Sequence, residues 1–202
     1  MVENQLVNRG INSEAVLDAM RKVPRHKFIP AEYINEAYDD HPVPIGYDQT
    51  ISQPYIVGYM TELVNPTSGM KALEIGTGSG YQAAILAEIV DKVYTIEIVP
   101  ELAQRSAQLL NEMGYKNIYV KHGDGYKGWL EFAPFDIVIV TAACNHIPQP
   151  LIDQLSENGR LVIPVGEPDS VQELIMMTKK KGKIIKKSLA LVRFVPFTRE
   201  KE

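Results

Sequence analysis

The chain has 202 residues, of which 45% are hydrophobic and 23% charged, as in an ordinary globular protein with a buried core. Its formal net charge of −4 argues against a general polyanion-binding role, because phosphate-dominated binding needs a clustered basic surface. A single cysteine, Cys144, excludes an internal disulfide framework, and the first residues lack the basic and apolar regions of a signal peptide. We therefore expect a cytoplasmic protein with no nucleic-acid or membrane partner. We also expect a monomer, although no residue pattern gives the oligomeric state.

The first region, to about residue 66, begins with a predicted helix. Asn12 or Ser13 can cap it, and apolar residues follow at helical spacing, namely Ala15, Val16, Ala19 and Met20. Four prolines between residues 24 and 44 then break the chain into turns and short extended pieces. Pro54 stands where a second helix is predicted to begin.

The second region alternates predicted strands and helices. Five apolar segments are predicted as strands, at residues 72–75, 93–96, 118–120, 135–140 and 160–163. One helix is predicted to follow the first strand, through residues 83–87, and another to run from Pro100 to Gly114. Strands this apolar are expected to be covered on both faces, which is typical of a parallel sheet flanked by helices.

No helix is predicted in the third region, residues 167–202. Residues 173–178 are predicted to be extended, residues 179–183 form a lysine-rich turn, and a second β-rich stretch ends at residues 192–196. An antiparallel hairpin at the edge of the sheet is the simplest interpretation. The lysines can also be read as a nucleic-acid patch, but on an acidic protein we favour solvated turn residues.

The most informative motif joins the first predicted strand of the second region to its helix. It contains Gly76, Gly78 and Gly80, which allow a sharp turn and a close approach of the backbone to a ligand. The dinucleotide fingerprint has its third glycine one residue later. Glu74 just before the glycines favours a cationic sulfonium ligand and would repel a pyrophosphate. The alternative is a tight turn that binds nothing.

Two further acidic residues follow later strands. Glu97 ends the second of these strands, where an acidic side chain can hydrogen-bond ribose hydroxyls; the alternative is a solvated acid before a helix. Asp124 follows the third strand and can accept a hydrogen bond from an adenine amino group, or it can only stabilise an Asx turn. Together these residues resemble the cofactor site of a class I S-adenosylmethionine methyltransferase.

A segment upstream of the glycines makes the resemblance more specific. Residues 50–56, Thr-Ile-Ser-Gln-Pro-Tyr-Ile, resemble the protein-L-isoaspartate O-methyltransferase family, and they are more diagnostic than the glycines. Matching segments cover nearly the whole chain, at residues 23–25, 28, 42–46, 50–56, 73–82, 123–125, 140–143, 159–166 and 193–196. Departures are Tyr47-Asp48 and Asn145-His146, which affect the expected substrate range and not the reaction type.

The resemblance implies a Rossmann-like α/β fold: a mostly parallel sheet with helices on both faces and an antiparallel C-terminal hairpin. It implies a single domain in which residues 1–66 lie on the substrate side, 67–166 form the cofactor-binding core and 167–202 a β-rich segment. The implied reaction moves the methyl group of S-adenosyl-L-methionine to the free carboxylate of L-isoaspartyl residues in age-damaged proteins and peptides. This initiates repair through a succinimide, leaves S-adenosyl-L-homocysteine and needs no metal.

The resemblance also assigns site residues. Ser52 is assigned as the catalytic residue. Substrate-binding residues are Thr50, Ile51, Ser52, Gln53, Pro54, Val192, Arg193, Phe194, Val195 and Pro196. Cofactor-binding residues are Gln53, Glu74, Gly76, Thr77, Gly78, Ser79, Gly80, Glu97, Asp124, Gly125 and Thr141.

The chemistry is consistent with neutral donors at the acceptor site. The isoaspartyl carboxylate is ionised near pH 7, since carboxyl pKa values lie around 4, so no strong base is needed. Thr50 and Ser52 can orient it as hydroxyl donors, and we expect no covalent intermediate. On sequence alone, Ser52 can equally be a helix N-cap ahead of Pro54.

Other interpretations remain open at this stage. A methyltransferase of the same fold can act on RNA or a small molecule, although residues 141–144, Thr-Ala-Ala-Cys, offer no motif that recognises a base. A non-catalytic binding module is a second alternative and a nicotinamide dehydrogenase a third, against which the glycine spacing counts. Cys144 near His146 can be a thiol nucleophile or metal pair, but a semi-buried structural cysteine is favoured.

Overall fold

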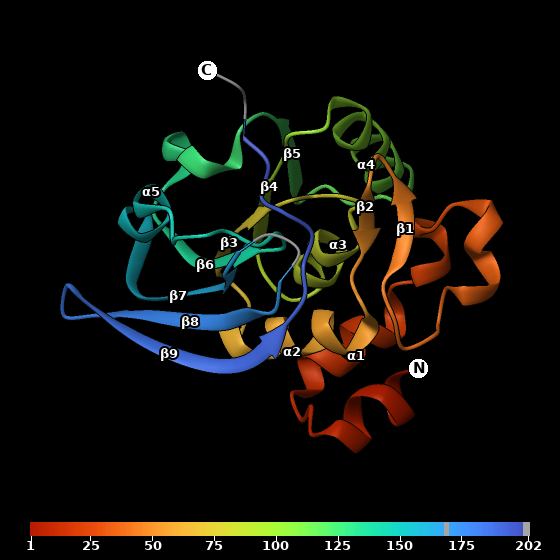
Figure 1. Cartoon of the computed structure of the whole chain (residues 1–202), viewed down its shortest axis with the longest axis horizontal. Helices are drawn as coiled ribbons and strands as arrows, with labels where there is room; N and C mark the ends of the chain where they lie inside the picture. Colours follow the sequence, from red (N-terminus) through yellow and green to blue (C-terminus); the bar gives the residue numbers. More distant parts are fainter. Residues whose placement is uncertain (168–169, 200–202) are drawn as a thin grey trace.

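The computed structural model describes residues 1–167 and 170–199 of the chain. Within them, seven strands form one sheet in the order β5-β4-β3-β6-β7-β8-β9 (Figure 1). Their bounds are β3 (Lys71–Ile75), β4 (Lys92–Glu97), β5 (Ile118–His122), β6 (Phe135–Val140), β7 (Leu155–Val165), β8 (Gln172–Lys180) and β9 (Lys183–Val192). The strands from β5 to β7 pair in parallel, whereas β8 and β9 pair antiparallel. This confirms the predicted α/β sheet with its C-terminal hairpin.

Helices cover both faces of the parallel strands. They are α1 (Glu14–Lys22), α2 (Pro54–Val64), α3 (Tyr81–Ala87), α4 (Pro100–Glu112) and α5 (Gln149–Asp153). Alternate residues of β3 pack in opposite directions: Leu73 lies in a cluster with Leu151 of α5, and Ala72 in a cluster with Met60 of α2. A strand buried on both faces reads as a continuous apolar run, which is why the sequence located β3, β4 and β6 correctly. In contrast, β5 is largely exposed, and β7 begins at Leu155, before its predicted start at residue 160.

The N-terminal region positions the side chains of Thr50 and Ser52. It contains the π-helix η1 (Val2–Leu6) and the 3₁₀ helices η2 (Val7–Arg9), η3 (Arg25–Phe28) and η4 (Ala31–Glu36). Two further 3₁₀ helices, η5 (Gly125–Lys127) and η6 (Leu130–Phe132), occur later in the chain. The strands β1 (Val43–Gly46) and β2 (Gln49–Ile51) form a separate hairpin. Its turn residues, Tyr47 and Asp48, both have φ of 56°. The hairpin leads Thr50 and Ser52 directly into α2.

Several predicted details were wrong. In α1, Ala15 is exposed and Leu17 is buried. Ser13 is the N-cap residue, as predicted, but its side chain makes no cap hydrogen bond. The backbone N–H groups of Asn12 and Ser13 instead donate to Glu62. The short helix α5 was not predicted, because prolines at 148 and 150 and only two apolar positions conceal it. The last strand ends at Val192, so residues 193–195 are not part of the hairpin.

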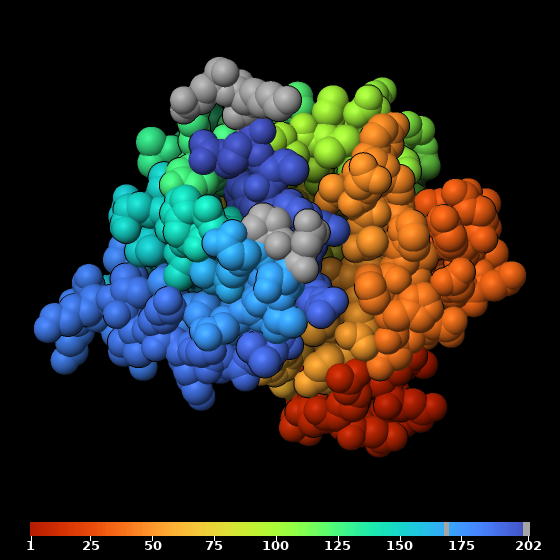
Figure 2. Space-filling model, in the orientation of Figure 1, coloured from red at the N-terminus to blue at the C-terminus, as the bar shows by residue number. Residues whose placement is uncertain are grey.

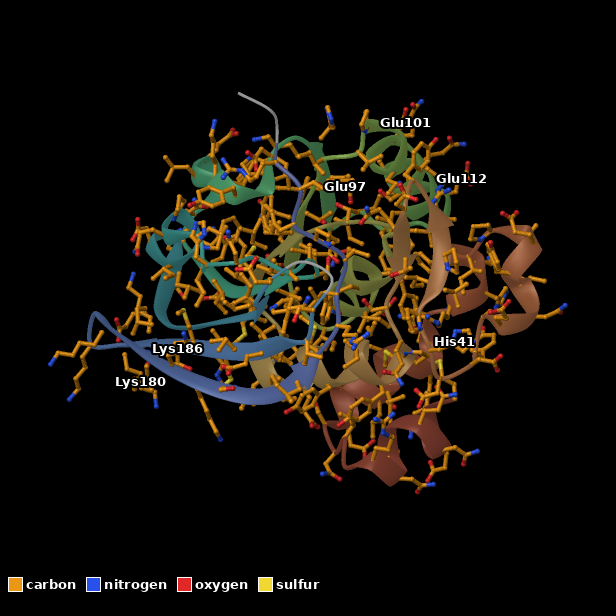
Figure 3. All side chains as sticks on the ribbon, in the orientation of Figure 1. His41, Glu97, Glu101, Glu112, Lys180 and Lys186 are labelled. Atoms are coloured by element: carbon orange, nitrogen blue, oxygen red, sulfur yellow. The ribbon has the colours of Figure 1, made fainter. Side chains whose placement is uncertain are left out.

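The lysine-rich turn projects from the sheet edge. Lys181 and Gly182 have φ of 50° and 71°, a conformation that fits a tight hairpin turn. Figure 3 shows Lys180 and Lys186 on this hairpin at the lower left of the view, away from Glu97 in its upper part. In the part of the chain that the structure describes, no helix is long and apolar enough to cross a membrane.

Candidate active site

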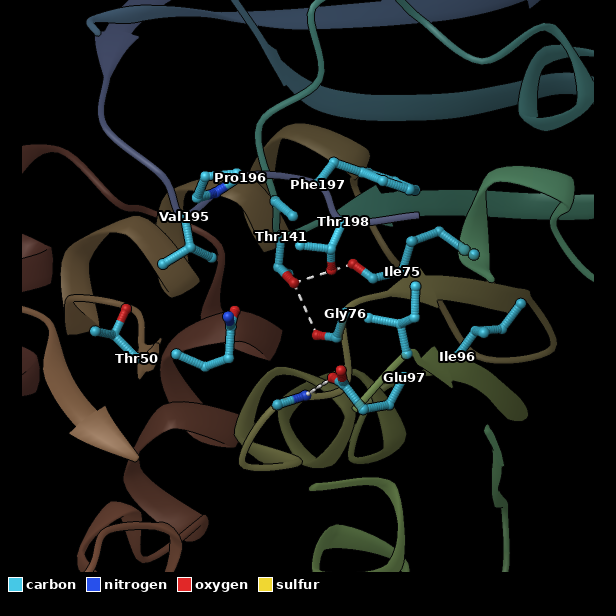
Figure 4. Close-up of a pocket in the computed structure, with 15 residues that line it drawn as sticks. Thr50, Ile75, Gly76, Ile96, Glu97, Thr141, Val195, Pro196, Phe197 and Thr198 are labelled. Carbon is cyan, nitrogen blue, oxygen red and sulfur yellow. Dashed lines mark hydrogen bonds between the residues drawn. The ribbon is translucent and has the colours of Figure 1, made fainter. Parts of the chain in front are cut away.

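The glycine loop between β3 and α3 is tightly enclosed. Gly76 has φ of 93°, and its N–H donates to the Ile96 carbonyl oxygen at 2.8 Å. A Cβ at this position would lie 2.4 Å from Thr141 Oγ1. The Thr141 hydroxyl in turn donates to the Gly76 carbonyl oxygen at 2.7 Å (Figure 4). The loop is therefore held between the ends of β4 and β6, and only glycine fits at residue 76.

Glu97 is positioned by the backbone around it. One carboxylate oxygen accepts the Gly78 N–H at 2.7 Å (Figure 4). The other accepts the Val99 N–H at 3.0 Å. The residue is only 5% exposed, so the solvated-acid alternative is wrong. Its carboxylate is oriented at the carboxyl end of β4, where ligands bind in open α/β sheets.

Glu74 is fully buried beneath the glycine loop. Its Oε2 accepts a hydrogen bond from Thr95 Oγ1 at 2.5 Å, while Oε1 has no partner among the described residues. Burial raises the pKa of Glu74 to about 8; the Thr95 hydrogen bond opposes this rise and the nearby Glu97 adds to it. A buried carboxyl with one oxygen unpaired is suited to receive a cationic group of a ligand.

Three neighbouring spaces share lining residues near the glycine loop. A central cavity is lined by the loops after β3, β4 and β6 and by the C-terminal segment, through Gln49, Thr50, Ile75, Gly76, Gly78, Ile96, Glu97, Ile98, Gly125, Thr141, Ala142, Val195, Pro196, Phe197 and Thr198 (Figure 4). An inner recess beneath it is lined by Ser52, Glu74, Thr77 and other residues. A groove of about 930 Å³ opens beside both. Thr50 and Thr141 line all three spaces.

The groove brings together segments from both ends of the chain. Figure 2 shows the N-terminal segments (orange) facing the C-terminal segments (blue) on the front of the molecule. Of the predicted substrate residues, those lining the groove are Thr50, Ser52, Gln53, Val192, Arg193, Phe194, Val195 and Pro196. Ile51 is 3% exposed and lines only the inner recess. Pro54 is buried as the first residue of α2 and lines none of the three spaces.

The Ser52 hydroxyl is not used as a helix cap. The N-cap of α2 is Gln53, and the helix has no side-chain cap hydrogen bond. The Gln53 side chain instead donates to the Asp40 carbonyl oxygen at 2.9 Å. Within the described residues the Ser52 hydroxyl has no hydrogen-bond partner, so it is left free at the boundary of groove and recess.

Asp124 is already engaged by protein groups. Its Oδ1 accepts the Tyr126 N–H at 2.9 Å, an Asx-type cap of η5, and Oδ2 accepts Arg199 Nε at 2.7 Å. The Arg199 guanidinium also lies 3.7 Å from the centre of the Tyr126 ring. The Asx-turn alternative is therefore realised, and a contact of Asp124 with adenine stays a prediction. The neighbouring Gly125 lines the central cavity, and a Cβ there would lie 2.3 Å from Ile75 Cγ2.

The remaining predicted cofactor residues lie around the loop. Thr77 and Ser79 face the inner recess, whereas Gly80 caps α3 and lines none of the three spaces. Gln53 faces the groove and not the central cavity. Direct contacts of Gly80 and Gln53 with the cofactor therefore stay predictions.

Cys144 has the environment of a structural cysteine. It is 7% exposed, and burial raises the pKa of its thiol to about 12 although Arg199 lowers it. A raised pKa disfavours the thiolate that a nucleophile or metal ligand needs. His146 bonds the Tyr126 hydroxyl at 2.9 Å through Nε2 and Asn145 through Nδ1. Across residues 1–167 and 170–199, no cluster of three or more His, Cys, Asp or Glu residues could hold a metal ion.

Sequence reasoning missed several lining residues. In the central cavity these include Gln49, Ile98, Ala142, Phe197 and Thr198, and in the groove they include Arg9, Tyr55, Tyr59 and Leu191. Phe197 and Thr198 directly follow the predicted 192–196 segment, so extending that segment by two residues would have found them. Arg9 had no local signal, because only the fold brings the N-terminal region to the groove.

The fold and this cleft define a class I S-adenosylmethionine-dependent methyltransferase. A family model described as protein-L-isoaspartate(D-aspartate) O-methyltransferase matches residues 1–202, and the chain belongs to this family.

Similar proteins agree with this assignment. A protein-L-isoaspartate O-methyltransferase of Gloeobacter violaceus is 57% identical over 201 residues, which cover 100% of this chain and 98% of the relative. One of Opitutus terrae is 56% identical, covering 100% and 86%. A solved structure from Plasmodium falciparum, described as a candidate enzyme of this kind in complex with S-adenosyl-L-homocysteine, has a TM-score of 0.86 and 32% identity. It covers 98% of this chain and 97% of its own.

Proposed function

We propose that the chain transfers the methyl group of S-adenosyl-L-methionine to the free carboxylate of L-isoaspartyl residues, with Ser52 and Thr50 orienting that carboxylate. The observation that carries the proposal is the position of Thr50 and Thr141, which line the central cavity, the inner recess and the groove together. A methyl donor in the cavity and a peptide in the groove would therefore meet beside these two hydroxyls.

The cavity residues fit the cofactor. S-adenosyl-L-methionine supplies a methyl group activated by a positively charged sulfur. The unpaired Oε1 of Glu74 offers a partner for the ammonium group of its amino-acid tail, which is consistent with a buried acid near the inner recess. Glu97, fixed by two N–H groups, is oriented to accept from ribose hydroxyls. The glycine loop allows the backbone to approach the ligand closely.

The acceptor site needs alignment more than acid–base chemistry. An isoaspartyl linkage runs the main chain through the side-chain carboxyl and leaves the α-carboxylate free and ionised near pH 7. Holding a carboxylate oxygen about 3 Å from the methyl carbon can supply several kcal/mol of the barrier. Neutral hydroxyl donors such as Ser52 and Thr50 orient the carboxylate without neutralising it, whereas an arginine would reduce its nucleophilicity. No covalent intermediate with the protein is required.

The methyl ester sets up repair without further help from this chain. The methoxy group of the ester is a better leaving group than the oxide of a carboxylate. The next backbone nitrogen can therefore attack the ester carbonyl carbon, form the succinimide C–N bond and release methanol, which carries away the amide proton. Hydrolysis of the succinimide then gives partly normal aspartate. The residues of the cleft need only complete the methyl transfer and release the peptide.

The proposed reaction also implies which partners the enzyme has. We propose that its macromolecular partners are isoaspartyl-containing proteins and peptides and that it acts as a cytoplasmic monomer. A net charge of −4 supports the absence of a nucleic-acid partner, because polyanion binding needs a clustered basic surface.

The test uses two peptides that differ only in one Asp or isoAsp linkage. With labelled S-adenosyl-L-methionine, we expect base-labile methyl incorporation into the isoAsp peptide alone. Cofactor binding with no transfer to either peptide would contradict the proposed acceptor and favour an RNA or small-molecule methyltransferase. Structured RNA assayed in parallel separates that alternative.

A further inference from the structure

An arginine and two tyrosines form a continuous stack on one wall of the groove. The Arg9 guanidinium carbon lies 3.6 Å from the centre of the Tyr55 ring. Tyr55 and Tyr59, one turn apart on α2, have ring centres 5.7 Å apart and planes inclined by 7°. All three residues line the groove, and none belongs to the machinery assigned above to the carboxylate or the cofactor. We call these three residues the Arg9–tyrosine stack.

The stack presents planar, weakly polar surface to the groove. The charge of Arg9 is balanced by Asp40, whose Oδ2 lies 2.9 Å from the arginine Nη1. The groove is also lined from β9 by Leu191, a large apolar side chain that is 75% exposed. Leu191 and the stack therefore offer apolar surface to the same groove from different elements of the fold.

The stack lies within reach of the residues that flank the isoaspartyl linkage. Tyr55 follows Ser52 by three residues and Tyr59 by seven, and a helix rises about 1.5 Å per residue. Ser52 lies two residues before the start of α2, and within the helix the two tyrosines are separated by roughly 6 Å along its axis. An extended peptide advances about 3.3 Å per residue, so a peptide anchored beside Ser52 can bring side chains one to three positions away to the stack.

We infer that the Arg9–tyrosine stack and Leu191 form a specificity subsite that takes a bulky apolar or aromatic side chain one to three positions from the isoaspartyl linkage. The inference rests on the proposed function, since it extends the peptide groove of that reaction. An aromatic side chain would gain both area burial and stacking on the tyrosine rings and the guanidinium plane. A glycine or a strongly hydrated side chain at the same position would gain neither.

The experiment is a positional scan of one isoaspartyl peptide. The parent peptide has glycine at the three positions on each side of the linkage, and six further peptides carry one phenylalanine each. For the wild-type enzyme we expect kcat/KM to be about five-fold higher with phenylalanine at one or two adjacent positions, mainly through a lower KM. Equal kcat/KM for the parent and all six phenylalanine peptides would overturn the subsite while leaving the proposed function standing. Methylation of none of the peptides would overturn both.

Two variants on different walls then test the assignment. Tyr59→Ser and Leu191→Ser should each reduce the phenylalanine-to-glycine ratio of kcat/KM toward one. The exposed position of Leu191 makes that variant safe for folding. Tyr119→Ala, on the opposite edge of the sheet, is the matched control and should keep the wild-type ratio. Variants that lower kcat/KM for all peptides by the same factor would overturn the subsite, because a merely structural role leaves the ratio unchanged.

Discussion

The central cavity is built from loops that follow consecutive parallel strands, whereas the groove collects segments from both ends of the chain. In the cavity, hydrogen bonds of 2.7–2.8 Å connect the glycine loop around Gly76 to the end of β4, which includes Glu97, and to Thr141 after β6. In the groove, the Ser52 hydroxyl is free and large side chains such as Leu191 remain exposed. On the proposed function, the cavity would be a preorganised cofactor site and the groove an adaptable peptide site, as suits an enzyme that meets many damaged sequences.

The largest expected effect is a loss of cofactor binding caused by a substitution in the central cavity alone. Gly76→Ala places a Cβ 2.4 Å from Thr141 Oγ1 at a φ of 93°, so both contact and backbone strain oppose it. We expect S-adenosyl-L-homocysteine to bind about 1,000-fold more weakly, or about 4 kcal/mol, by calorimetry. Gly114→Ala is the matched control, because its φ is 88° but a Cβ there meets nothing within 4 Å. Equal losses in both variants would contradict the enclosed-loop explanation.

The second prediction concerns the buried acid of the cavity. Glu74 has a folded-state pKa of about 8 against 4.5 when unfolded, so between these values the folded state holds the proton more tightly. The free energy of unfolding of the cofactor-free enzyme should therefore fall as pH rises through this window, by on the order of 1 kcal/mol per pH unit from this group. Glu74→Gln should remove that slope.

Urea unfolding at pH 5, 6.5 and 8 measures this difference. The exposed Glu101→Gln (Figure 3) serves as the control and should follow the wild-type slope. An unchanged pH slope in Glu74→Gln would mean that burial does not hold this carboxyl neutral.

The third prediction addresses the peptide side. Ser52→Ala removes a hydroxyl that neither caps α2 nor bonds a described residue, so the fold should not change. We expect kcat with an isoaspartyl peptide to fall about 30-fold, or about 2 kcal/mol, while the dissociation constant of S-adenosyl-L-homocysteine stays within two-fold. Ser188→Ala, exposed on β9, is the control for serine loss. A wild-type kcat in Ser52→Ala would remove Ser52 from the catalytic assignment.

The smallest expected effect comes from the C-terminal segment, which lines both the central cavity and the groove. Arg199 pairs with Asp124, whose side chain is 6% exposed, and stacks on Tyr126. Arg199→Gln should weaken S-adenosyl-L-homocysteine binding about five-fold, or about 1 kcal/mol, because Phe197 and Thr198 beside it line the cavity. Arg21→Gln, an exposed ion-pair residue of α1, is the control. Unchanged affinity in Arg199→Gln would show that this ion pair does not position the cavity wall.

Where sequence reasoning succeeded, the signal was local. The apolar strands, the glycine turn and the segment around Ser52 each depend on neighbouring residues, and the family assignment drew on the same segments. Sequence reasoning left two residues open between two local interpretations. Ser52 was as plausible a helix cap as a site residue, and Asp124 could bind adenine or stabilise an Asx turn. The structure shows that the Ser52 side chain does not cap α2 and that Asp124 caps η5, while their roles at the site stay predictions.

By itself, the sequence determined the parallel core, the position of the glycine loop and the family, because strand hydrophobicity, glycine spacing and short motifs act over a few residues. Only the tertiary structure decided that Arg9 stacks on Tyr55, that Arg199 reaches Asp124 and that Thr141 closes over Gly76. These pairs are separated by 46, 75 and 65 residues, from 55−9, 199−124 and 141−76. Contacts at such separations depend on how the sheet and its connections fold, and no local pattern specifies them.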